Sequence, residues 1–338
     1  ITGSTFLQNK ALDGDGGAIY TDTPGTVTIS GATFTQNEAS SDGGAIYFED
    51  VQATILNSTF SGNMASSAGA VYINHGTLDI QDSSFTGNQA TSGNGGALYL
   101  DAGTITISRT TLMNNSSTGE GGAIMLYGDD DPTRVEIHDS TISGNSADNG
   151  GAIYVYGGYT AGTELLINRT TISGNTASSE GGGIYVYADD PVRLDIVNST
   201  LSGNSANGYG GGIYLYGDDD TFVTIVNSTI TGNRADADDA GGEYGGGIYN
   251  YNYNGSTYVT IYNSIIAGNV NGTAAPVASD LEGSGVETTS SHNLIGDPNS
   301  AGGLMNTVNG NIVGQSGGVI PIASILAPLA NNGGLTQT

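Results

Sequence analysis

The chain has 338 residues, no cysteine, no tryptophan and a formal net charge of −27. Only six residues are Lys or Arg, against 33 Asp or Glu. This balance excludes a nucleic-acid partner, because binding phosphates requires clustered positive charge, and it disfavours docking on an anionic membrane. The most apolar stretch, residues 319–330, contains Pro321 and Pro328 and is too short to span a bilayer, so no membrane span is expected.

Three short blocks recur along the chain at intervals of about 25 to 36 residues. In chain order, the first block reads apolar-x-x-Asn and ends at Asn9, the second reads Gly-Gly-Ala-Ile-Tyr and begins at Gly16, and the third centres on Ile29. Variants of all three blocks return until about residue 270. Gly supplies 56 residues, and long helix-forming runs are missing. The composition is therefore all-β.

The blocks predict three short strands per repeat, because apolar and polar residues alternate with period two. Ile153-Tyr154-Val155-Tyr156 is one example, and Val223-Thr224-Ile225 is another. Strands this short need neighbours, and stacking equivalent strands gives parallel ladders about 4.8 Å apart. We predict a right-handed parallel β-helix of about ten coils over residues 1–270, with residues 271–338 as an irregular continuation or cap. The predicted interior column holds Ile19, Ile46, Leu98, Ile153, Ile184, Ile213 and Ile248, with each following Tyr facing outward.

The recurring Asn is interpreted as a structural element of the turns rather than a catalytic residue. Asn tolerates left-handed backbone geometry where a chain turns a corner, and stacked Asn side chains can bond along a rod. The Gly pair marks a second tight corner, where φ is positive or a Cβ would collide. The predicted Asn ladder consists of Asn37, Asn63, Asn88, Asn145, Asn175, Asn204 and Asn233.

The GGAI motif at Gly16, Gly43, Gly121 and Gly150, together with motifs such as Phe34-Thr35-Gln36-Asn37, resembles the GGAI and FxxN repeats of the chlamydial polymorphic membrane proteins. These proteins are autotransported adhesins with β-helical passenger domains. The segment His292-Asn293-Leu294-Ile295-Gly296 and the final residues 328–338 look like bacterial β-helix proteins of the choice-of-anchor Q type. Both resemblances imply an extracellular or cell-surface location.

Three acidic runs occupy the same turn of neighbouring repeats, and each begins five residues after the Ile of the second block. Stacked carboxylates repel one another, and a bound Ca²⁺ would relieve the repulsion. The alternative is a solvated acidic edge with Arg134 and Arg193 as ion-pair partners. The candidate calcium ligands are Asp129, Asp130, Asp189, Asp190, Asp218 and Asp219.

Tyrosines form two outward columns in the later repeats. Rows of exposed Tyr stack on sugar rings or pack against a second rod, whereas ordinary stacking along a parallel ladder would also produce such rows. The candidate ligand or partner stripe consists of Tyr154, Tyr156, Tyr185, Tyr187, Tyr214, Tyr216, Tyr249 and Tyr251.

No enzymatic activity is expected. A polysaccharide lyase would use acids such as Asp189 and Asp218 with Arg193, but an acidic substrate needs a basic groove that six Lys and Arg hardly supply. We instead expect an extracellular structural rod that assembles head-to-tail with other copies of itself into filaments or matrix. The alternative is an adhesin that binds extracellular polysaccharide through the Tyr stripe.

Overall fold

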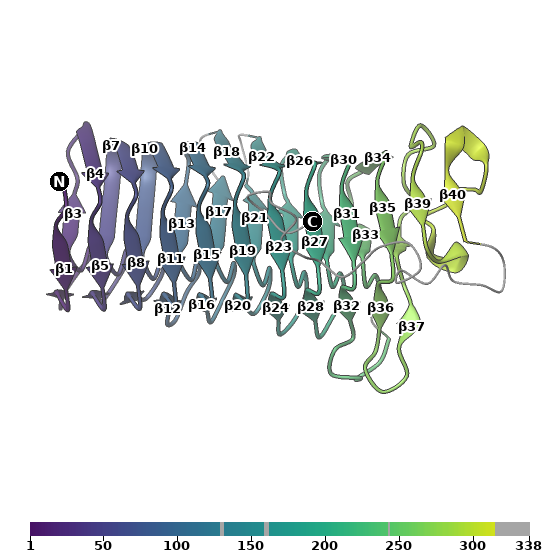
Figure 1. Ribbon diagram of the computed structural model, residues 1–338, viewed down its shortest axis with the longest axis horizontal. Coiled ribbons are helices and arrows are strands. Elements are labelled where there is room, and N and C mark those ends of the chain that lie inside the picture. The colour runs from purple at the N-terminus through teal and green to yellow at the C-terminus, as the bar shows by residue number, and fades with distance from the viewer. Residues whose placement is uncertain (129–131, 159–161, 243, 315–338) are drawn as a thin grey trace.

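The computed structural model describes residues 1–128, 132–158, 162–242 and 244–314, which form a rod of stacked coils (Figure 1). Apart from one short antiparallel contact, between Val270–Asn271 and Val277–Ala278, every strand pairing in these residues is parallel. Each strand pairs with the equivalent strand of the next coil, so all hydrogen-bonded ladders run along the rod. The predicted all-β parallel solenoid is confirmed.

One surface of each coil is formed by the Gly-Gly-Ala-Ile-Tyr block, and we call its strands the tyrosine ladder. The ladder consists of β3 (Ile19–Thr21), β7 (Ile46–Leu56), β10 (Val71–Gln81), β13 (Leu98–Asp101), β17 (Ile124–Gly128), β21 (Ile153–Gly157), β25 (Ile184–Ala188), β29 (Ile213–Gly217), β33 (Ile248–Asn252) and β38 (Leu281–Gly283).

The next surface, after a turn, is the arginine ladder, named for the Arg residues on its outer side. Strands β7 and β10 are long enough to run through both ladders. The arginine ladder consists of β4 (Gly25–Ser30), the second halves of β7 and β10, β14 (Gly103–Ser108), β18 (Thr133–His138), β22 (Thr163–Asn168), β26 (Val192–Val197), β30 (Thr221–Val226) and β34 (Thr257–Tyr262).

The third surface is the phenylalanine ladder, formed by the apolar-x-x-Asn blocks. It consists of β1 (Thr5–Leu7), β5 (Thr33–Thr35), β8 (Thr59–Ser61), β11 (Ser84–Thr86), β15 (Thr111–Met113), β19 (Thr141–Ser143), β23 (Thr171–Ser173), β27 (Thr200–Ser202), β31 (Thr229–Thr231), β35 (Ile265–Ala267), β39 (Leu294–Ile295) and β40 (Ile312–Val313).

A fourth ladder of two-residue strands follows the recurring Asn and was not predicted, because two residues show no periodicity. It consists of β2 (Lys10–Ala11), β6 (Glu38–Ala39), β9 (Met64–Ala65), β12 (Gln89–Ala90), β16 (Ser116–Ser117), β20 (Ser146–Ala147), β24 (Thr176–Ala177), β28 (Ser205–Ala206), β32 (Arg234–Ala235), β36 (Val270–Asn271) and β37 (Val277–Ala278). Beyond it lie two 3₁₀ turns, η1 (Pro298–Ser300) and η2 (Val308–Gly310).

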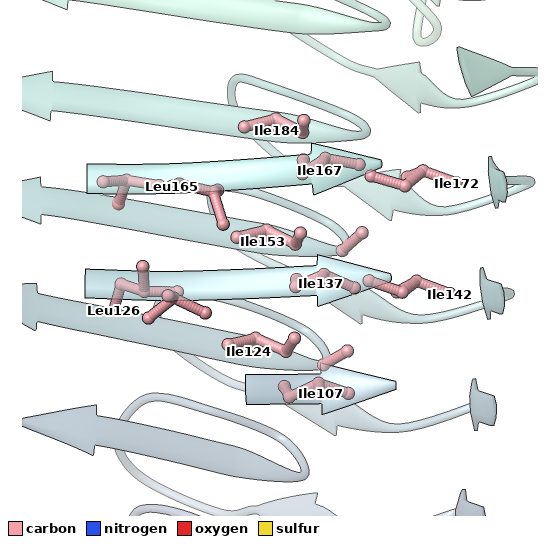
Figure 2. Packing of buried hydrophobic residues seen from close by; sticks show 14 of the residues in the cluster. Ile107, Ile124, Leu126, Ile137, Ile142, Ile153, Leu165, Ile167, Ile172 and Ile184 are labelled. Carbon is pink, nitrogen blue, oxygen red and sulfur yellow. The ribbon is translucent and has the colours of Figure 1, made fainter. Parts of the chain in front are cut away.

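The interior is a continuous column of aliphatic side chains (Figure 2). Ile153 pairs in register with Ile184, and both are fully buried, whereas the adjacent Tyr154 and Tyr185 lie outside the main core. The predicted register is confirmed, since a slip of one residue would reverse the two faces. In the first four coils the phenylalanine ladder adds an inward ring stack, in which the centroids of Phe34 and Phe60 are 4.7 Å apart.

The Asn ladder is buried and runs along the rod. The backbone N–H and the Nδ2 of Asn145 both donate to Oδ1 of Asn175 over 2.9 Å, and Nδ2 also donates to the carbonyl of Leu112 over 3.1 Å. The predicted hydrogen bonding is confirmed, but the predicted backbone geometry is wrong. The left-handed residue is the one before each Asn, such as Gly144 with φ of 65°. The Asn is therefore selected for its amide rather than for its backbone.

The Asn ladder ends on a buried carboxylate. Asp280 is 0% exposed and its Oδ1 accepts the backbone N–H and the Nδ2 of Asn269, over 3.1 and 2.9 Å. Its Oδ2 accepts the backbone N–H of Asp297 over 2.8 Å. A terminal residue of the ladder needs acceptors only, and a carboxylate supplies them. Burial raises the pKa of Asp280 to about 6, although these hydrogen bonds lower it in part.

This raised pKa predicts that acid stabilises the C-terminal coils. The pKa rises from 3.8 in the unfolded chain to about 6 in the folded chain, so the contribution is complete below pH 4 and is lost as pH rises through 6. The loss amounts to at most about 3 kcal/mol. In Asp280→Asn this pH-dependent part should vanish. Hydrogen exchange of β36 and β39 from pH 4 to 7 measures the difference between the two proteins.

Glu120 and Glu282 also have raised pKa values, but they are present in both proteins and cancel in that difference. Equal pH dependence in wild type and Asp280→Asn would show that Asp280 is not the titrating group.

Candidate functional site

The outer side of the tyrosine ladder carries two adjacent columns of aromatic rings, which we call the tyrosine face. Because side chains alternate along a strand, Tyr154 and Tyr156 both point outward, and in-register pairing places each above its equivalent in the next coil. Successive ring centroids in the second column lie 5.0 Å apart from Tyr127 to Tyr156, 5.7 Å to Tyr187 and 4.8 Å to Tyr216. The first column contains Tyr20, Tyr47, Tyr72, Tyr99, Tyr154, Tyr185, Tyr214 and Tyr249, with Met125 in register, and the second contains Tyr127, Tyr156, Tyr187, Tyr216 and Tyr251.

The two columns differ in exposure, which the sequence did not predict. Tyr154, Tyr185 and Tyr214 are only 9%, 8% and 7% exposed. They point away from the main core but pack in a separate aromatic cluster against the second column. The expectation that these rings are exposed is therefore wrong for Tyr154, Tyr185 and Tyr214. The surface available to a ligand is mainly the second column.

Exposure is greatest at the C-terminal end of the tyrosine face. Tyr251 is 39% exposed and Tyr253 is 56% exposed, and the ring of Tyr253 stacks on Tyr216 at 5.6 Å. Tyr244 is 47% exposed and lies in the turn before β33. Sequence reasoning missed Tyr244 and Tyr253 because both lie outside the repeating blocks. Their closeness in sequence to Tyr249 and Tyr251 could have indicated that they belong to the same face.

Carboxylates border the tyrosine face on both sides. On one side, Glu120 and Glu180 occupy the position before the Gly pair, where their backbone N–H groups bond to Asn94 and Asn149 over 2.8 and 3.0 Å. On the other side, the Oη of Tyr156 donates to Oδ2 of Asp189 over 3.1 Å.

These carboxylates and the burial of the rings perturb the pKa values of the face. Burial, followed by the charge of Asp189, raises the pKa of Tyr187 to about 12. Burial raises the pKa of Glu120 to about 7; the hydrogen bond with Asn149 lowers it in part, and the charges of Asp148 and Glu180 add to the increase. The face therefore favours neutral phenols and a protonated Glu120.

The predicted calcium site lies at the turn between the tyrosine and arginine ladders. Asp129 and Asp130 fall outside the described residues. Asp189 accepts the Tyr156 hydroxyl, and Asp218 accepts Nδ2 of Asn254 over 2.6 Å. Within residues 1–314, leaving out the three gaps, no three His, Cys, Asp or Glu side chains form a group that could hold a metal ion. Asp190 and Asp219 lie in the same turn, and bound calcium stays a prediction.

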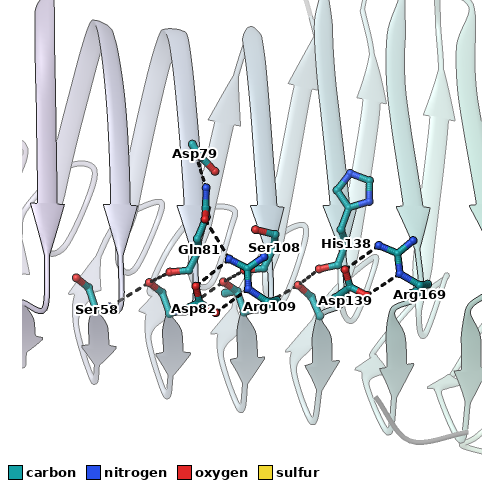
Figure 3. Close-up of polar contacts among 12 residues, drawn as sticks. Ser58, Asp79, Gln81, Asp82, Ser108, Arg109, His138, Asp139 and Arg169 are labelled. Carbon is teal, nitrogen blue, oxygen red and sulfur yellow. Dashed lines mark hydrogen bonds and ion pairs between the residues drawn. The ribbon is translucent and has the colours of Figure 1, made fainter. Parts of the chain in front are cut away.

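The basic residues lie elsewhere, mostly along the arginine ladder and its following corner. At the corner, which Figure 3 shows, Nε of Arg109 bonds to Asp82 and Nε of Arg169 bonds to Asp139, each over 2.7 Å. On the ladder itself, Nε of Arg193 bonds to Asp195 over 2.7 Å. Each of these arginines is thus neutralised by a carboxylate of its own surface, and Arg193 is not directed at the acidic turn.

A groove runs over the start of the arginine-ladder strands. Its volume is about 480 Å³, and Arg134, Glu164, Arg193 and Phe222 lie along it. The guanidinium of Arg134 bonds to both Glu136 and Glu164. The ring of Phe222 stacks on Tyr258 at 5.2 Å. The groove combines paired charges with one aromatic pair, so it is a weaker candidate than the tyrosine face.

The fold and the repeat define a β-helix repeat protein with an aromatic outer face. The chain belongs to the family described as the right handed beta helix region, which matches residues 17–266 and 122–317. Residues 3–22 also match the Chlamydia polymorphic membrane protein repeat, which supports the predicted resemblance and an association with the cell surface. The resemblance of the C-terminal segment to choice-of-anchor Q proteins is not shown by these matches.

The comparisons with curated proteins and with solved structures gave no significant match. Among the described residues, none of the helices has the length and apolar character that a membrane span requires.

Proposed function

We propose that this protein is an extracellular structural rod that holds a polysaccharide along its tyrosine face. The observation that carries the proposal is the second tyrosine column, in which Tyr127, Tyr156, Tyr187 and Tyr216 follow one another at 4.8 to 5.7 Å. Because these rings stack on one another, the row presents ring edges to solvent, and these edges form an apolar strip against which the apolar faces of sugar rings pack. One ring per coil provides a linear polymer with the same contact at every step.

Many weak contacts in a row give a polymer high avidity without a deep pocket. This agrees with the open, shallow surface of the second column, where most rings are half-buried. The match to a surface-protein repeat supports the extracellular location. The tyrosines on a solvent-facing ladder also support a binding role rather than a catalytic one, and the absence of enzymatic activity stays a prediction.

The exposed end of the face gives the sharpest test. The double variant Tyr251→Ala, Tyr253→Ala should weaken binding of polysaccharide about fivefold or more, since each lost aromatic contact is worth about 0.5–1.5 kcal/mol. Affinity electrophoresis in gels containing neutral, amino or uronate polysaccharides measures the change.

The matched control is Phe222→Ala, Tyr258→Ala on the arginine ladder. Phe222 and Tyr258 are 42% and 39% exposed, close to the 39% of Tyr251, and they also stack. This control should leave binding unchanged. An equal loss in both double variants, or no retardation by any polysaccharide, would contradict the proposed function.

Head-to-tail assembly with other copies, predicted from the sequence, is a separate question that the contacts described above do not test. It stays a prediction. Sedimentation of the same wild-type protein during the binding measurements separates polymer binding from self-association.

A further inference from the structure

A pocket lies at the C-terminal end of the tyrosine face, where the first column of rings ends. Tyr249 is the last tyrosine of that column, and it pairs in register with Glu282 of β38. The pocket has a volume of about 280 Å³, and Tyr244, Val277, Glu282 and Asn299 lie along it. Val277 belongs to β37, which pairs with β36 at this end of the rod (Figure 1). The column therefore ends at a cavity lined by an aromatic ring, a carboxylate and an amide.

We propose that this pocket binds the terminal sugar unit of a neutral polysaccharide whose chain lies along the tyrosine face. The inference rests on the proposed function and adds to it a site that recognises the end of a chain. Pockets for drug-sized ligands begin at about 300 Å³, so this cavity suits a smaller group such as a single sugar ring. The assignment is carried by the position of the pocket, its unstacked ring, its fixed polar groups and its charge.

The C-terminal side of the pocket is formed by the next coil. Leu281 forms a parallel bridge with Ala301, which directly follows η1, so Asn299 belongs to the coil beyond Glu282. A sugar chain that runs along the face from the N-terminal coils reaches Glu282 and then meets this segment. The last sugar of the chain, rather than an internal one, therefore occupies the pocket.

The ring of Tyr244 is available in a way that the stacked rings are not. From Tyr127 to Tyr216, each ring of the second column is covered by its neighbours at 4.8 to 5.7 Å. Tyr244 is 47% exposed, and within the part of the chain that the structure describes it stacks on no other ring. Its ring can therefore present a face, rather than an edge, to the apolar side of a sugar.

A buried hydroxyl links the two sides of the pocket. Ser279 is 1% exposed, and its Oγ accepts the backbone N–H of Gly245 over 2.9 Å. The same hydroxyl donates a hydrogen bond to Glu282. The residue that follows Tyr244 and the carboxylate of Glu282 are thus joined through one side chain, which holds the ring and the carboxylate on a common frame.

Asp297 positions the amide of the pocket. It is 2% exposed, its Oδ1 accepts the backbone N–H of Asn299 over 3.1 Å, and its Oδ2 accepts the hydroxyl of Ser300 over 2.6 Å. Nδ2 of Asn299 also donates to Oδ1 over 3.3 Å, which leaves its amide oxygen and its second N–H for a ligand. Sugar hydroxyls both donate and accept, so they match the carboxylate of Glu282 together with this amide.

The charge of the pocket favours a neutral ligand. Burial, followed by the charge of Asp297, raises the pKa of Glu282, whereas the hydrogen bond from Ser279 lowers it in part. None of the described residues that line the pocket is Lys or Arg. A uronate or sulfated sugar would bring a further negative charge beside Glu282 without a positive partner. A neutral sugar instead donates hydroxyl groups to the carboxylate.

The first test uses tetrasaccharides of β-1,4-linked glucose, mannose and N-acetylglucosamine, and isothermal calorimetry on the complete chain should detect binding of at least one. Tyr244→Ala, Glu282→Gln should weaken it about tenfold or more, because the variant removes the stacking ring and a charged hydrogen-bond acceptor. The matched control is Tyr20→Ala, Glu49→Gln at the N-terminal end of the same face, where Tyr20 is 50% exposed. This control should leave the affinity unchanged, and circular dichroism confirms that both variants remain folded.

Recognition of the chain end has its own measurement. The wild-type protein is titrated with the tetrasaccharide in the presence of a soluble polysaccharide of the same sugar, either intact or partly hydrolysed. At equal mass, chains cut to about a tenth of their length offer about ten times more ends and should compete about ten times more strongly, by mass action. Competition that depends on mass alone would show that internal sugars occupy the pocket, and it would overturn the inference.

Each alternative result has a distinct meaning. If gels retard the protein but no tetrasaccharide binds, or if Tyr244→Ala, Glu282→Gln changes the affinity no more than the control, the pocket inference is wrong while the proposed function stands. If no polysaccharide and no tetrasaccharide binds, the proposed function itself fails. If tetrasaccharides bind through the pocket but no polysaccharide is retarded, the pocket takes free oligosaccharides, and both the face as a polymer site and the chain-end inference are overturned.

Discussion

Asn145→Ala is expected to lower the free energy of unfolding by about 3–5 kcal/mol. Asn145 is 0% exposed, and its Oδ1 accepts the backbone N–H and the Nδ2 of Asn115 over 2.8 and 3.0 Å. Its own Nδ2 donates a hydrogen bond to the carbonyl of Leu112. Alanine removes the side-chain partner of two buried groups, the Asn115 N–H and the Leu112 carbonyl, and each loss costs about 1–3 kcal/mol, partly offset by local relaxation.

The effect should be local at first, because each coil of a solenoid contacts only its neighbours. Hydrogen exchange should therefore accelerate most in β15, β19 and β23 and less in coils further along the rod. Thr118→Ala is the control, because Thr118 is exposed in the same region and should change stability by less than about 0.5 kcal/mol. A small effect of Asn145→Ala, similar to that of the control, would show that the buried ladder contributes little to stability.

Phe60→Ala is expected to cost about 3–5 kcal/mol for a different reason. Phe60 is fully buried, and its ring stacks on Phe34 at 4.7 Å and on Phe85 at 4.5 Å. Removing it leaves a cavity between two rings that the neighbouring coils cannot close without moving their strands. Thermal unfolding followed by circular dichroism measures the loss.

Phe60→Leu provides the matched comparison. In the next coil but one, Leu112 occupies the same column and pairs in register with Phe85. The ladder thus already accepts Leu beside Phe, and Phe60→Leu should cost less than about 2 kcal/mol. Equal destabilisation by Ala and Leu would show that the ring stack itself, rather than the filled volume, stabilises the N-terminal coils.

Much of the architecture could be predicted from the sequence because the repeat imposes it. The alternation Ile153-Tyr154 fixes which side chain enters the interior, and the confirmed register follows from that alone. The burial of Tyr185 could not be predicted in this way. It depends on packing against the rings of the second column, and the two-residue alternation of side chains does not show how closely those rings pack.

The turns likewise combine a feature that the sequence predicts with features that it does not. Gly144 and Gly174 precede ladder asparagines, and their positive φ of 65° and 63° explains why Gly recurs there. The sequence contained that signal, but the same corner is also made by Gln36 and Asn114, so the residue type does not mark it uniquely. The two-residue strands such as β20 are formed entirely by stacking on neighbouring coils. Local sequence reasoning cannot detect them.

The direction of the Asn ladder has a consequence for rod length. In the side-chain bonds between ladder residues, each amide from Asn37 to Asn269 donates to the next coil and accepts from the preceding one, and Asp280 closes the series as an acceptor. Each intervening coil presents the same pair of groups to its neighbours. A whole coil inserted or deleted between these ends would therefore leave the hydrogen bonding at the terminator unchanged. The number of coils is free to vary by duplication, and Asp280 would terminate a rod of any length.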